Sequence, residues 1–352
     1  MHSHKNQLRL VAWEVTRRCN LNCIHCRAAS GRGPYPGELD NKKCMEILDQ
    51  ISKVGSPIVI LTGGEPLLRE DIFDLAAHGT DAGLRMVMAT NGSLLTPEII
   101  EKMKSSGIKR VSISIDGADK HQHDQFRMVE GAFDRSLEGI RLLREADLEF
   151  QINTTVTRHN VDDIEKILNL SVGLGAKAHH LFLLVPTGRA KEMTDQEIEA
   201  GEYERLLHWF YQMRDKVPLH LKATCAPHYY RILRQEAHAR GEKVTFETYG
   251  LDAMTRGCLG GTSFCFISYE GVVQPCGYLE INCGDLRQSG FASVWQGSEQ
   301  FLQLRDLSSY KGKCGICEYI RVCGGCRARA YESTGDFLAE EPLCAHEPKK
   351  GC

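Results

Sequence analysis

Three cysteines, Cys19, Cys23 and Cys26, follow one another near the start of the chain, separated by three and then by two residues. Thiolates at such spacing bind metals, and a structural zinc ion takes four nitrogen or sulfur ligands in a closed tetrahedron. This loop has no fourth cysteine, and His25 adjoins Cys26 too closely to complete a tetrahedron without strain. An iron–sulfur cube held by three thiolates would leave one iron open. The triplet therefore favours an open [4Fe-4S] cluster over zinc or unreactive thiols.

A second polar segment, Gly63-Gly64-Glu65, ends the next apolar run of the chain. Glycine lets the backbone approach a ligand closely because it has no Cβ, and the Glu65 carboxylate can pair with a cation such as an α-ammonium group. Beside an open iron, this segment could hold a small chelating molecule. Taken alone, it is equally compatible with a simple turn. Asn91 and Asp116 follow later apolar runs in the same way.

The elements that must position these residues are short apolar runs that alternate with amphipathic segments between Leu8 and Pro218. The runs LRLVAWEV, SPIVILTGG, LRMVMATNG, KRVSISIDG, EFQINTTVT and HHLFLLVPTG read as buried strands. Strands that are apolar throughout pair in parallel under covering helices, and the polar signals fall at strand ends, as in barrel active sites. We predict an α/β fold, a partial (β/α)6 TIM-like barrel. A doubly wound open sheet is the alternative.

Whole-chain properties indicate a globular protein of one large or two smaller domains. Its 352 residues are 42% hydrophobic, and a formal net charge of −3 argues against a nucleic-acid partner. Neither a signal peptide nor an apolar stretch of membrane-spanning length is present, so we expect a cytoplasmic protein without a membrane span. We expect an N-terminal tail at 1–7, the barrel at 8–218, a linker or helical lid segment at 219–256 and a metal-organised domain at 257–352.

Ten of the fifteen cysteines lie between Cys258 and Cys352. Two CxxC pairs are present, but only five residues separate them, which is short for a zinc ribbon. Eight cysteines divide evenly into two four-thiolate clusters: Cys258, Cys265, Cys276, Cys314, Cys317, Cys323, Cys326 and Cys344. For the remaining cysteines outside the triplet, we expect Cys44 and Cys225 to be thiols packed in the core. Cys283 is an alternative to Cys265 as a cluster ligand, and Cys352 is expected to be a thiol at a frayed terminus.

The triplet followed by Gly-Gly-Glu-Pro in an α/β barrel resembles the radical S-adenosylmethionine (SAM) superfamily, over about residues 8–218. In that family the methionyl amine and carboxylate of SAM chelate the fourth iron, and an electron from the cluster cleaves SAM to a 5′-deoxyadenosyl radical. The resemblance implies that Gly63, Gly64 and Glu65 receive the amine. The resemblance also implies that Asn91 lies around SAM and that His25 lies near its adenine. It implies that the nucleoside is lined by Ser114, Asp116, Asn153 and Leu184, for which strand-end capping is the alternative role.

The C-terminal pattern, including Gly271-x4-Cys276, resembles the SPASM extension of radical SAM enzymes. That resemblance implies two auxiliary [4Fe-4S] clusters. One would be held by Cys258, Cys265, Cys276 and Cys326, and the other by Cys314, Cys317, Cys323 and Cys344. The family pattern commonly has three residues between the last two cysteines of its central block, where this chain has two, so the partition stays open.

Auxiliary clusters can accept an electron from a substrate radical, which indicates net oxidation. Segments such as VAWEVTRRCNLNCIHCRAAS, LKATCAPHYYRILRQ and CGGCRARAYESTGDFLAEEPLC resemble the heme b synthase family of the siroheme-dependent heme pathway. The resemblance implies oxidative decarboxylation of two propionates of Fe-coproporphyrin III to vinyl groups. It also implies a low-potential electron donor such as flavodoxin or ferredoxin.

A flat macrocycle rimmed by carboxylates needs apolar walls and a few cations, and arginine pairs best with carboxylates. The candidates are Arg17, Arg18 and Arg27 beside the cysteine triplet, and His228, Tyr229, Tyr230 and Arg231 as a lid. Of His179 and His180, one could face the barrel interior.

Three other functions remain open on the sequence. They are a SPASM enzyme that modifies peptides, a related porphyrin enzyme of heme d1 formation or didecarboxysiroheme processing, and an iron–sulfur electron carrier. A peptide-modifying enzyme often carries an N-terminal leader-binding domain, and few residues precede the first predicted strand here. A carrier would not need the open triplet beside Gly-Gly-Glu.

Overall fold

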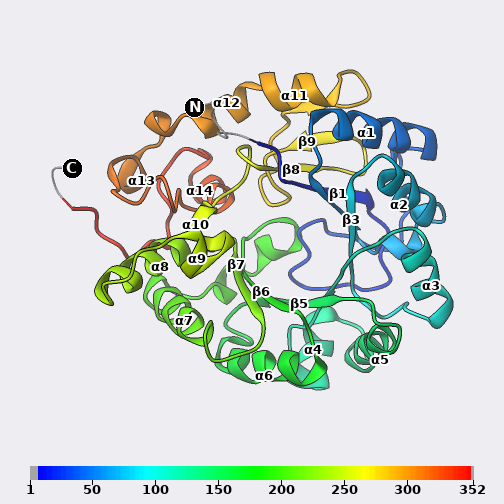
Figure 1. The fold of residues 1–352 in the computed structure, drawn as a ribbon, viewed down its shortest axis with the longest axis horizontal. Helices are drawn as coiled ribbons and strands as arrows, with labels where there is room; N and C mark the ends of the chain where they lie inside the picture. Colours follow the sequence, from blue (N-terminus) through cyan, green and yellow to red (C-terminus); the bar gives the residue numbers. More distant parts are fainter. Residues whose placement is uncertain (1–6, 350–352) are drawn as a thin grey trace.

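The computed structural model describes residues 7–349, which form one continuous ten-stranded sheet (Figure 1). The strand order is β10-β9-β8-β1-β2-β3-β4-β5-β6-β7. Almost all of the expected N-terminal tail at 1–7, and Cys352, lie outside the described residues. Within residues 7–349, no helix combines the length and the apolar character that crossing a membrane requires.

Seven strands in chain order pair in parallel with their sequence neighbours. They are β1 (Leu10–Thr16), β2 (Ile58–Gly63), β3 (Arg85–Thr90), β4 (Val111–Ser114), β5 (Phe150–Val156), β6 (Ala178–Leu183) and β7 (His220–Thr224). The first six confirm the predicted β-α units. Consecutive order also excludes a doubly wound sheet, in which the order reverses at a switch point. β7 is an additional strand inside the segment that we expected to be a linker or lid.

Helices lie outside the curved parallel sheet, in the manner of a partial barrel (Figure 1). They are α1 (Asn41–Val54), α2 (Ile72–Asp81), α3 (Pro97–Ser105), α4 (Lys120–Arg127), α5 (Ala132–Glu145), α6 (Ile164–Leu174), α7 (Ala200–Met213) and α8 (His228–Ala239). Capping residues mark where some of these helices begin. At the start of α1, Asp40 accepts a hydrogen bond from Lys43 N at 2.8 Å, and at the start of α3, Thr96 accepts one from Ile99 N and Pro97 lies in the first turn. Their buried faces pack on the strands as one core.

The C-terminal region extends the same sheet beyond β1. Strand β8 (Phe264–Ile267) pairs in parallel with β1, and β9 (Val272–Gln274) and β10 (Gly284–Asp285) continue the sheet in antiparallel fashion. The remaining helices are short: α9 (Phe246–Tyr249), α10 (Leu251–Met254), α11 (Phe291–Gly297), α12 (Glu299–Arg305), α13 (Gly312–Ile316) and α14 (Arg327–Thr334). The strand that leads to the cysteine triplet is therefore held directly against the C-terminal region.

Candidate functional site

The cysteine triplet lies on the loop that follows β1. Cys19 and Cys23 are buried and Cys26 is half-buried, and all three are free thiols. The loop is fixed from both sides, because Cys19 N donates to Gly31 O at 2.7 Å and the Arg189 guanidinium donates to Cys23 O at 2.8 Å. All fourteen cysteines in the described part of the chain are likewise unpaired. Gathered but unbonded thiols fit metal binding better than a disulfide framework.

The three thiols lie close enough to influence one another. Burial, with smaller contributions from Glu65, Cys23 and Cys26, raises the pKa of Cys19 to about 12. Thiols of this kind stay protonated until a metal displaces the proton. His25 makes a face-to-face contact with Phe126 at 4.2 Å between ring centroids, and burial lowers its pKa well below the usual value. The triplet therefore fits a cluster with three protein ligands, and the neutral His25 ring is part of an aromatic stack beside it.

The glycines after β2 are required by close packing on the loop of the triplet. A Cβ atom on Gly63 would lie 2.1 Å from Thr16 O, and one on Gly64 would lie 2.3 Å from Arg18 O. The backbone is bound there as well, since Gly64 N donates to Thr16 O at 2.8 Å and Glu65 N to Arg18 O at 2.7 Å. Any larger residue would push this segment away from the cysteine loop.

Glu65 is a fully buried carboxylate held by neutral donors. It accepts hydrogen bonds from Thr90 Oγ1 at 2.7 Å, Asn91 N at 2.8 Å and Leu67 N at 3.1 Å. Burial raises the pKa of Glu65 and these hydrogen bonds lower it, but burial has the larger effect. The resulting pKa is about 7. A positive charge or an amine N–H placed beside this carboxylate would stabilise its ionised form. The site thus suits the amine of a bound cofactor.

Asn91 connects β3 to the cysteine loop. Its side-chain amide donates to Asn20 Oδ1 at 2.8 Å, and the Asn20 amide donates to Ser93 Oγ at 2.8 Å. Asn91 Oδ1 in turn accepts from Ser93 N and Ser93 Oγ. The sequence pointed to Asn91 as a strand-end residue but not to Asn20, whose position beside Cys19 was the available signal.

Asp116 and Arg127 form a buried ion pair next to the triplet. Arg127 also donates to Cys23 Sγ at 3.5 Å, and Asp116 accepts from Thr155 N at 2.6 Å. The Asp116 carboxylate is therefore bound within the protein, and its predicted place beside the nucleoside stays a prediction. Arg127 was missed in the sequence because only the fold brings α4 against the cysteine loop.

Ser114, Asn153 and His180 form a row across three neighbouring strands, since Ser114 pairs with Asn153 and Asn153 pairs with His180. Their chain neighbours Ile113, Ile152 and His179 are fully buried in the outer, helix-facing layer. Because side chains alternate along a strand, the row faces the barrel interior. The His179 ring confirms that the neighbouring side chains face outward, since its Nδ1 atom is hydrogen-bonded at 2.9 Å to Ser171 Oγ of the covering helix α6.

Leu184, just after β6, is buried among Phe126, Ala190 and Met193, with Ile24 packed against them. It therefore lies on the same aromatic stack as His25. The fold thus brings two of the predicted nucleoside residues from distant parts of the chain to one place, although their contact with a cofactor stays a prediction.

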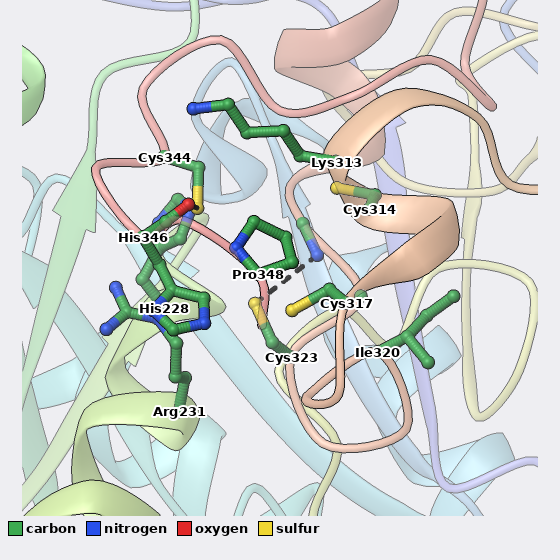
Figure 2. A pocket seen from close by; sticks show the side chains of 12 residues that line it. His228, Arg231, Lys313, Cys314, Cys317, Ile320, Cys323, Cys344, His346 and Pro348 are labelled. Carbon is green, nitrogen blue, oxygen red and sulfur yellow. Dashed lines mark hydrogen bonds between the residues drawn. The ribbon is translucent and has the colours of Figure 1, made fainter. Parts of the chain in front are cut away.

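Four cysteines of the C-terminal domain line one cavity, as expected for one auxiliary cluster: Cys314, Cys317, Cys323 and Cys344 (Figure 2). Gly325 N donates to Cys323 Sγ at 3.5 Å, and the Arg327 guanidinium donates to Cys314 Sγ at 3.4 Å. Such donors stabilise sulfur that carries negative charge. Four convergent free thiols fit a [4Fe-4S] cluster with all of its protein ligands present.

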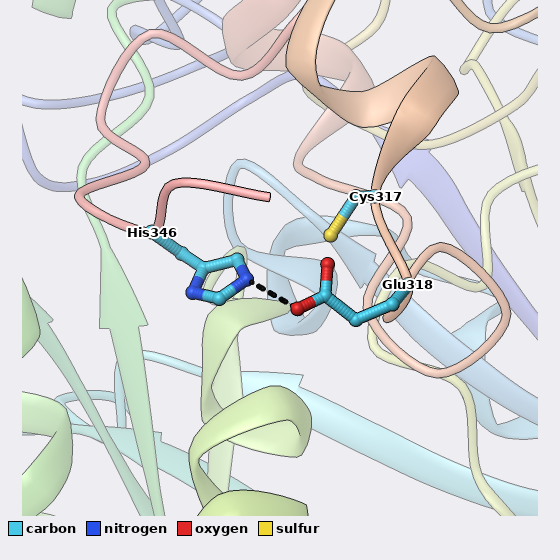
Figure 3. A group of neighbouring side chains, drawn as sticks. All are labelled: Cys317, Glu318 and His346. Carbon is cyan, nitrogen blue, oxygen red and sulfur yellow. Dashed lines mark hydrogen bonds and ion pairs between the residues drawn. The ribbon is translucent and has the colours of Figure 1, made fainter. Parts of the chain in front are cut away.

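A small polar group borders this cavity. The ligand atoms of Cys317, Glu318 and His346 lie within 4.8 Å of one another, and the His346 ring is 3.1 Å from Glu318 Oε1 (Figure 3). The His346–Glu318 contact holds the C-terminal segment against the loop that carries Cys317. Because the Cys317 thiol also belongs to the four-cysteine cavity, the group is best understood as a support for that cavity.

The prediction of a lid at His228, Tyr229, Tyr230 and Arg231 is wrong. All four side chains are at most 3% exposed on helix α8, which packs against α7. Arg231 is neutralised by an ion pair with Glu204 of α7, and His228 and Arg231 line the four-cysteine cavity (Figure 2). The polar residue types suggested a location at the surface. The ion pair of Arg231 and the packing of the aromatic rings instead allow these side chains to be buried.

The prediction that Cys265 binds a cluster is also wrong. Cys265 lies on β8 opposite Val11, and its neighbour Phe266 faces the interior, where the Arg27 guanidinium stacks on its ring at 4.2 Å. Alternation along the strand therefore directs Cys265 to the opposite, outer face. There it is fully buried in the main core beside Cys283, the suggested substitute. By contrast, desolvation raises the pKa of the half-buried Cys276 and the nearby Cys326 and Cys258 raise it as well, so these three thiols do lie together.

The arginines that flank the triplet lie between the barrel and the C-terminal domain. Arg17 Nε donates to the buried Glu14 carboxylate at 3.0 Å, and Arg27 Nη1 lies 3.6 Å from its other oxygen. The Arg17 guanidinium lies over the Tyr269 ring at 4.5 Å, much as Arg27 lies over Phe266. Arg18 is more exposed and lies 3.8 Å from Glu38.

Comparison with known proteins agrees with both halves of this arrangement. Residues 13–171 match the model of the radical SAM superfamily, and residues 258–327 match SPASM, an iron–sulfur cluster-binding domain. The chain is 56% identical to the AdoMet-dependent heme synthase of Nitratidesulfovibrio vulgaris over 97% of its own length and 93% of that protein. It is 54% identical to the AdoMet-dependent heme synthase of Methanosarcina barkeri, over 98% of each chain.

Among solved structures, Streptococcus suis SuiB bound to S-adenosylmethionine is similar in fold, with a TM-score of 0.76 and 17% sequence identity. The match covers 97% of this chain and 78% of SuiB. Together these similarities confirm the predicted fold and the predicted cofactors, which are SAM with its cluster in the barrel and auxiliary iron–sulfur clusters in the C-terminal domain.

Proposed function

Because the chain belongs to the radical SAM superfamily and carries a SPASM iron–sulfur domain, we propose that it converts two propionates of Fe-coproporphyrin III to vinyl groups, forming heme b. It is a radical SAM enzyme of heme synthesis, as the identity of 54–56% to AdoMet-dependent heme synthases over nearly the whole chain indicates. That similarity is the observation that carries the proposal. Fe-coproporphyrin III and its oxidative decarboxylation are our assignment of substrate and reaction.

When bound, the open cluster and SAM supply a 5′-deoxyadenosyl radical, which removes one hydrogen atom from each propionate. The propionate then loses carbon dioxide and one electron, so that R–CH2–CH2–COO⁻ becomes R–CH=CH2. The electron needs an acceptor, and a domain with auxiliary clusters can take it. The direct pairing of β8 with β1 supports this role, because it holds that domain against the strand that leads to the triplet.

Arg17 and Arg27 are the best candidates to bind substrate carboxylates. Their side chains are 26% and 16% exposed, so they are largely held in place yet still accessible. Each guanidinium lies over an aromatic ring and has N–H groups beyond those directed at Glu14, which can donate to carboxylate oxygens. Tyr269 and Phe266 also offer apolar surface to a flat macrocycle. Glu14 between the two arginines orients them before substrate binds.

We further propose that the enzyme works in the cytoplasm and receives electrons from a low-potential donor such as flavodoxin or ferredoxin. The cleavage of SAM consumes one electron for each radical formed. A small diffusible donor in the same compartment would meet that need.

Anaerobic incubation of the reconstituted protein with SAM, a reductant and Fe-coproporphyrin III, followed by mass analysis, tests the proposal. The porphyrin should lose two molecules of carbon dioxide and four hydrogen atoms, with one 5′-deoxyadenosine formed per vinyl group. A porphyrin that stays unchanged while SAM is cleaved rapidly would point to another substrate. Cys44→Ala is a suitable control, because Cys44 is a fully buried core thiol on α1 and should be dispensable.

A further inference from the structure

Cys225 lies where β7 ends and α8 begins, outside the cysteine pattern of the C-terminal domain. Its backbone has φ of 54°, in the left-handed region that residues other than glycine seldom adopt. Such a conformation persists when the surrounding structure fixes it, and it is frequent at functional sites. The contacts around Cys225 must therefore hold the backbone in this conformation.

Those surroundings are other cysteines. The Cys225 side chain lies beside that of Cys326 and packs with Cys276 around the same apolar group. Cys276 in turn interacts with both Cys326 and Cys258. The segment before Cys258 is also pressed against the start of α8, because a Cβ atom on Gly257 would lie 2.6 Å from Pro227 Cα. Four thiols from separate segments thus converge on one place.

A buried ion pair holds this place together. Arg329 Nη2 donates to Cys225 O at 3.1 Å, and Arg329 Nη1 donates to Glu341 Oε1 at 3.1 Å. The other Glu341 oxygen accepts from Cys326 N at 2.6 Å. One Arg–Glu pair therefore fixes the backbone of both Cys225 and Cys326. Arg329 Nη2 also donates to Leu184 O at 3.0 Å, which links the group to the predicted nucleoside site.

We propose that Cys225 is the fourth thiolate ligand of the first auxiliary cluster, together with Cys258, Cys276 and Cys326. Cys265 cannot fill that position, because β8 directs it to the outer face of the sheet beside Cys283. Four thiolates give a [4Fe-4S] cluster without an open iron. This cluster is then suited to accept an electron rather than to bind a substrate. The inference does not depend on which substrate the enzyme uses.

The matched variants Cys225→Ala and Cys265→Ala, each purified and reconstituted anaerobically, test the assignment. We measure iron and sulfide per chain, and electron paramagnetic resonance (EPR) spectra before and after reduction. Cys225→Ala should lose about one third of its cluster iron, or one iron from that cluster, which would appear as the signal of an oxidised [3Fe-4S] cluster. Cys265→Ala should keep the iron content and the spectra of the wild type.

The reverse pattern, with a full set of clusters in Cys225→Ala and a loss in Cys265→Ala, would overturn the assignment. Cys225→Ser keeps the inference testable if the alanine variant does not fold. Serine can ligate iron through oxygen, so this variant should keep its iron but show altered EPR spectra and a shifted reduction potential for one cluster. Spectra and potentials identical to the wild type would mean that Cys225 only packs in the core.

Discussion

The two cysteine-rich regions of the chain differ in the number of thiols that the fold gathers at one place. On the loop after β1, three thiols converge, with Arg127 hydrogen-bonded to Cys23 and the Glu65 carboxylate close enough to influence Cys19. In the C-terminal domain, four thiols line one cavity, and Cys258, Cys276 and Cys326 converge with Cys225 from the end of β7. A cluster with three protein ligands can bind a small molecule, whereas one with four is closed.

The regions also differ in how their cysteines are held. Strand ends of one parallel sheet position the triplet, so glycine and asparagine contacts to β2 and β3 fix it. Loops and short helices position seven of the other eight thiols, and the end of β7 positions Cys225; buried arginines such as Arg327 and Arg329 hold them. Chemistry at an open iron needs a rigid edge of the barrel, whereas electron transfer needs only burial and fixed distances.

The largest expected effect comes from removing a ligand of the open cluster. Cys26→Ala leaves two thiols on the loop, which cannot hold a stable cube. Formation of 5′-deoxyadenosine should fall below detection, whether or not porphyrin is present, while the iron of the C-terminal domain remains. Liquid chromatography of the products measures this. Residual cleavage at a rate near that of the wild type would show that another group replaces the thiol.

Cys323→Ala makes the complementary change in the four-cysteine cavity. The variant should lose about one third of its iron but still cleave SAM, because the triplet is intact. Vinyl product should fall much further than 5′-deoxyadenosine, since one of the two auxiliary clusters that carry the electron away from the substrate radical is missing. The ratio of the two products is the measurement. A fall in both to the same extent would remove the functional distinction between the two regions.

Asp116→Asn tests the buried pair that supports the triplet. Arg127 would remain buried without a counter-charge, which costs about 3–5 kcal/mol of folding stability. The melting temperature should fall accordingly. Glu138→Gln removes an exposed partner of Arg141 and serves as the matched control, with no measurable change expected. Equal melting temperatures for both variants would contradict the structural role of the Asp116–Arg127 pair.

Glu65→Gln has a smaller effect, and one that depends on pH. Burial raises the pKa of Glu65 to about 7, so the carboxyl group stabilises the folded state most at low pH and this contribution is lost as pH rises through 7. Pairing with the SAM amine needs the ionised form. The affinity advantage of the wild type over Glu65→Gln should therefore grow from little below about pH 6 to about tenfold near pH 8. Equilibrium binding of SAM at several pH values measures it, and a ratio independent of pH would contradict the pairing.

The sequence was sufficient for the parts of the molecule that local patterns encode. Six apolar runs predicted six strands, and the spacing of Cys19, Cys23 and Cys26 predicted a loop of convergent free thiols. β7 was missed because HLKAT is short and half polar, and the pairing of β8 with β1 joins residues far apart in the chain.

The errors share a physical cause, which is that spacing along the chain does not reveal the face on which a side chain lies. Cys265 fitted a ligand pattern but faces outward on β8. His228 and Arg231 suggested a lid, yet the ion pair of Arg231 with Glu204 allows α8 to be buried. Arg127 and Asn20 gain their roles only through contacts between strand ends and a distant helix.

The most direct test of the account is whether SAM binds to an iron that the triplet leaves open. The reduced protein is examined by electron–nuclear double resonance with SAM labelled with nitrogen-15 at the amine and oxygen-17 at the carboxylate. Coupling of both labels to one cluster, absent in Cys26→Ala, is the predicted result. Spectra that contain no such coupling in the wild-type protein would contradict the account.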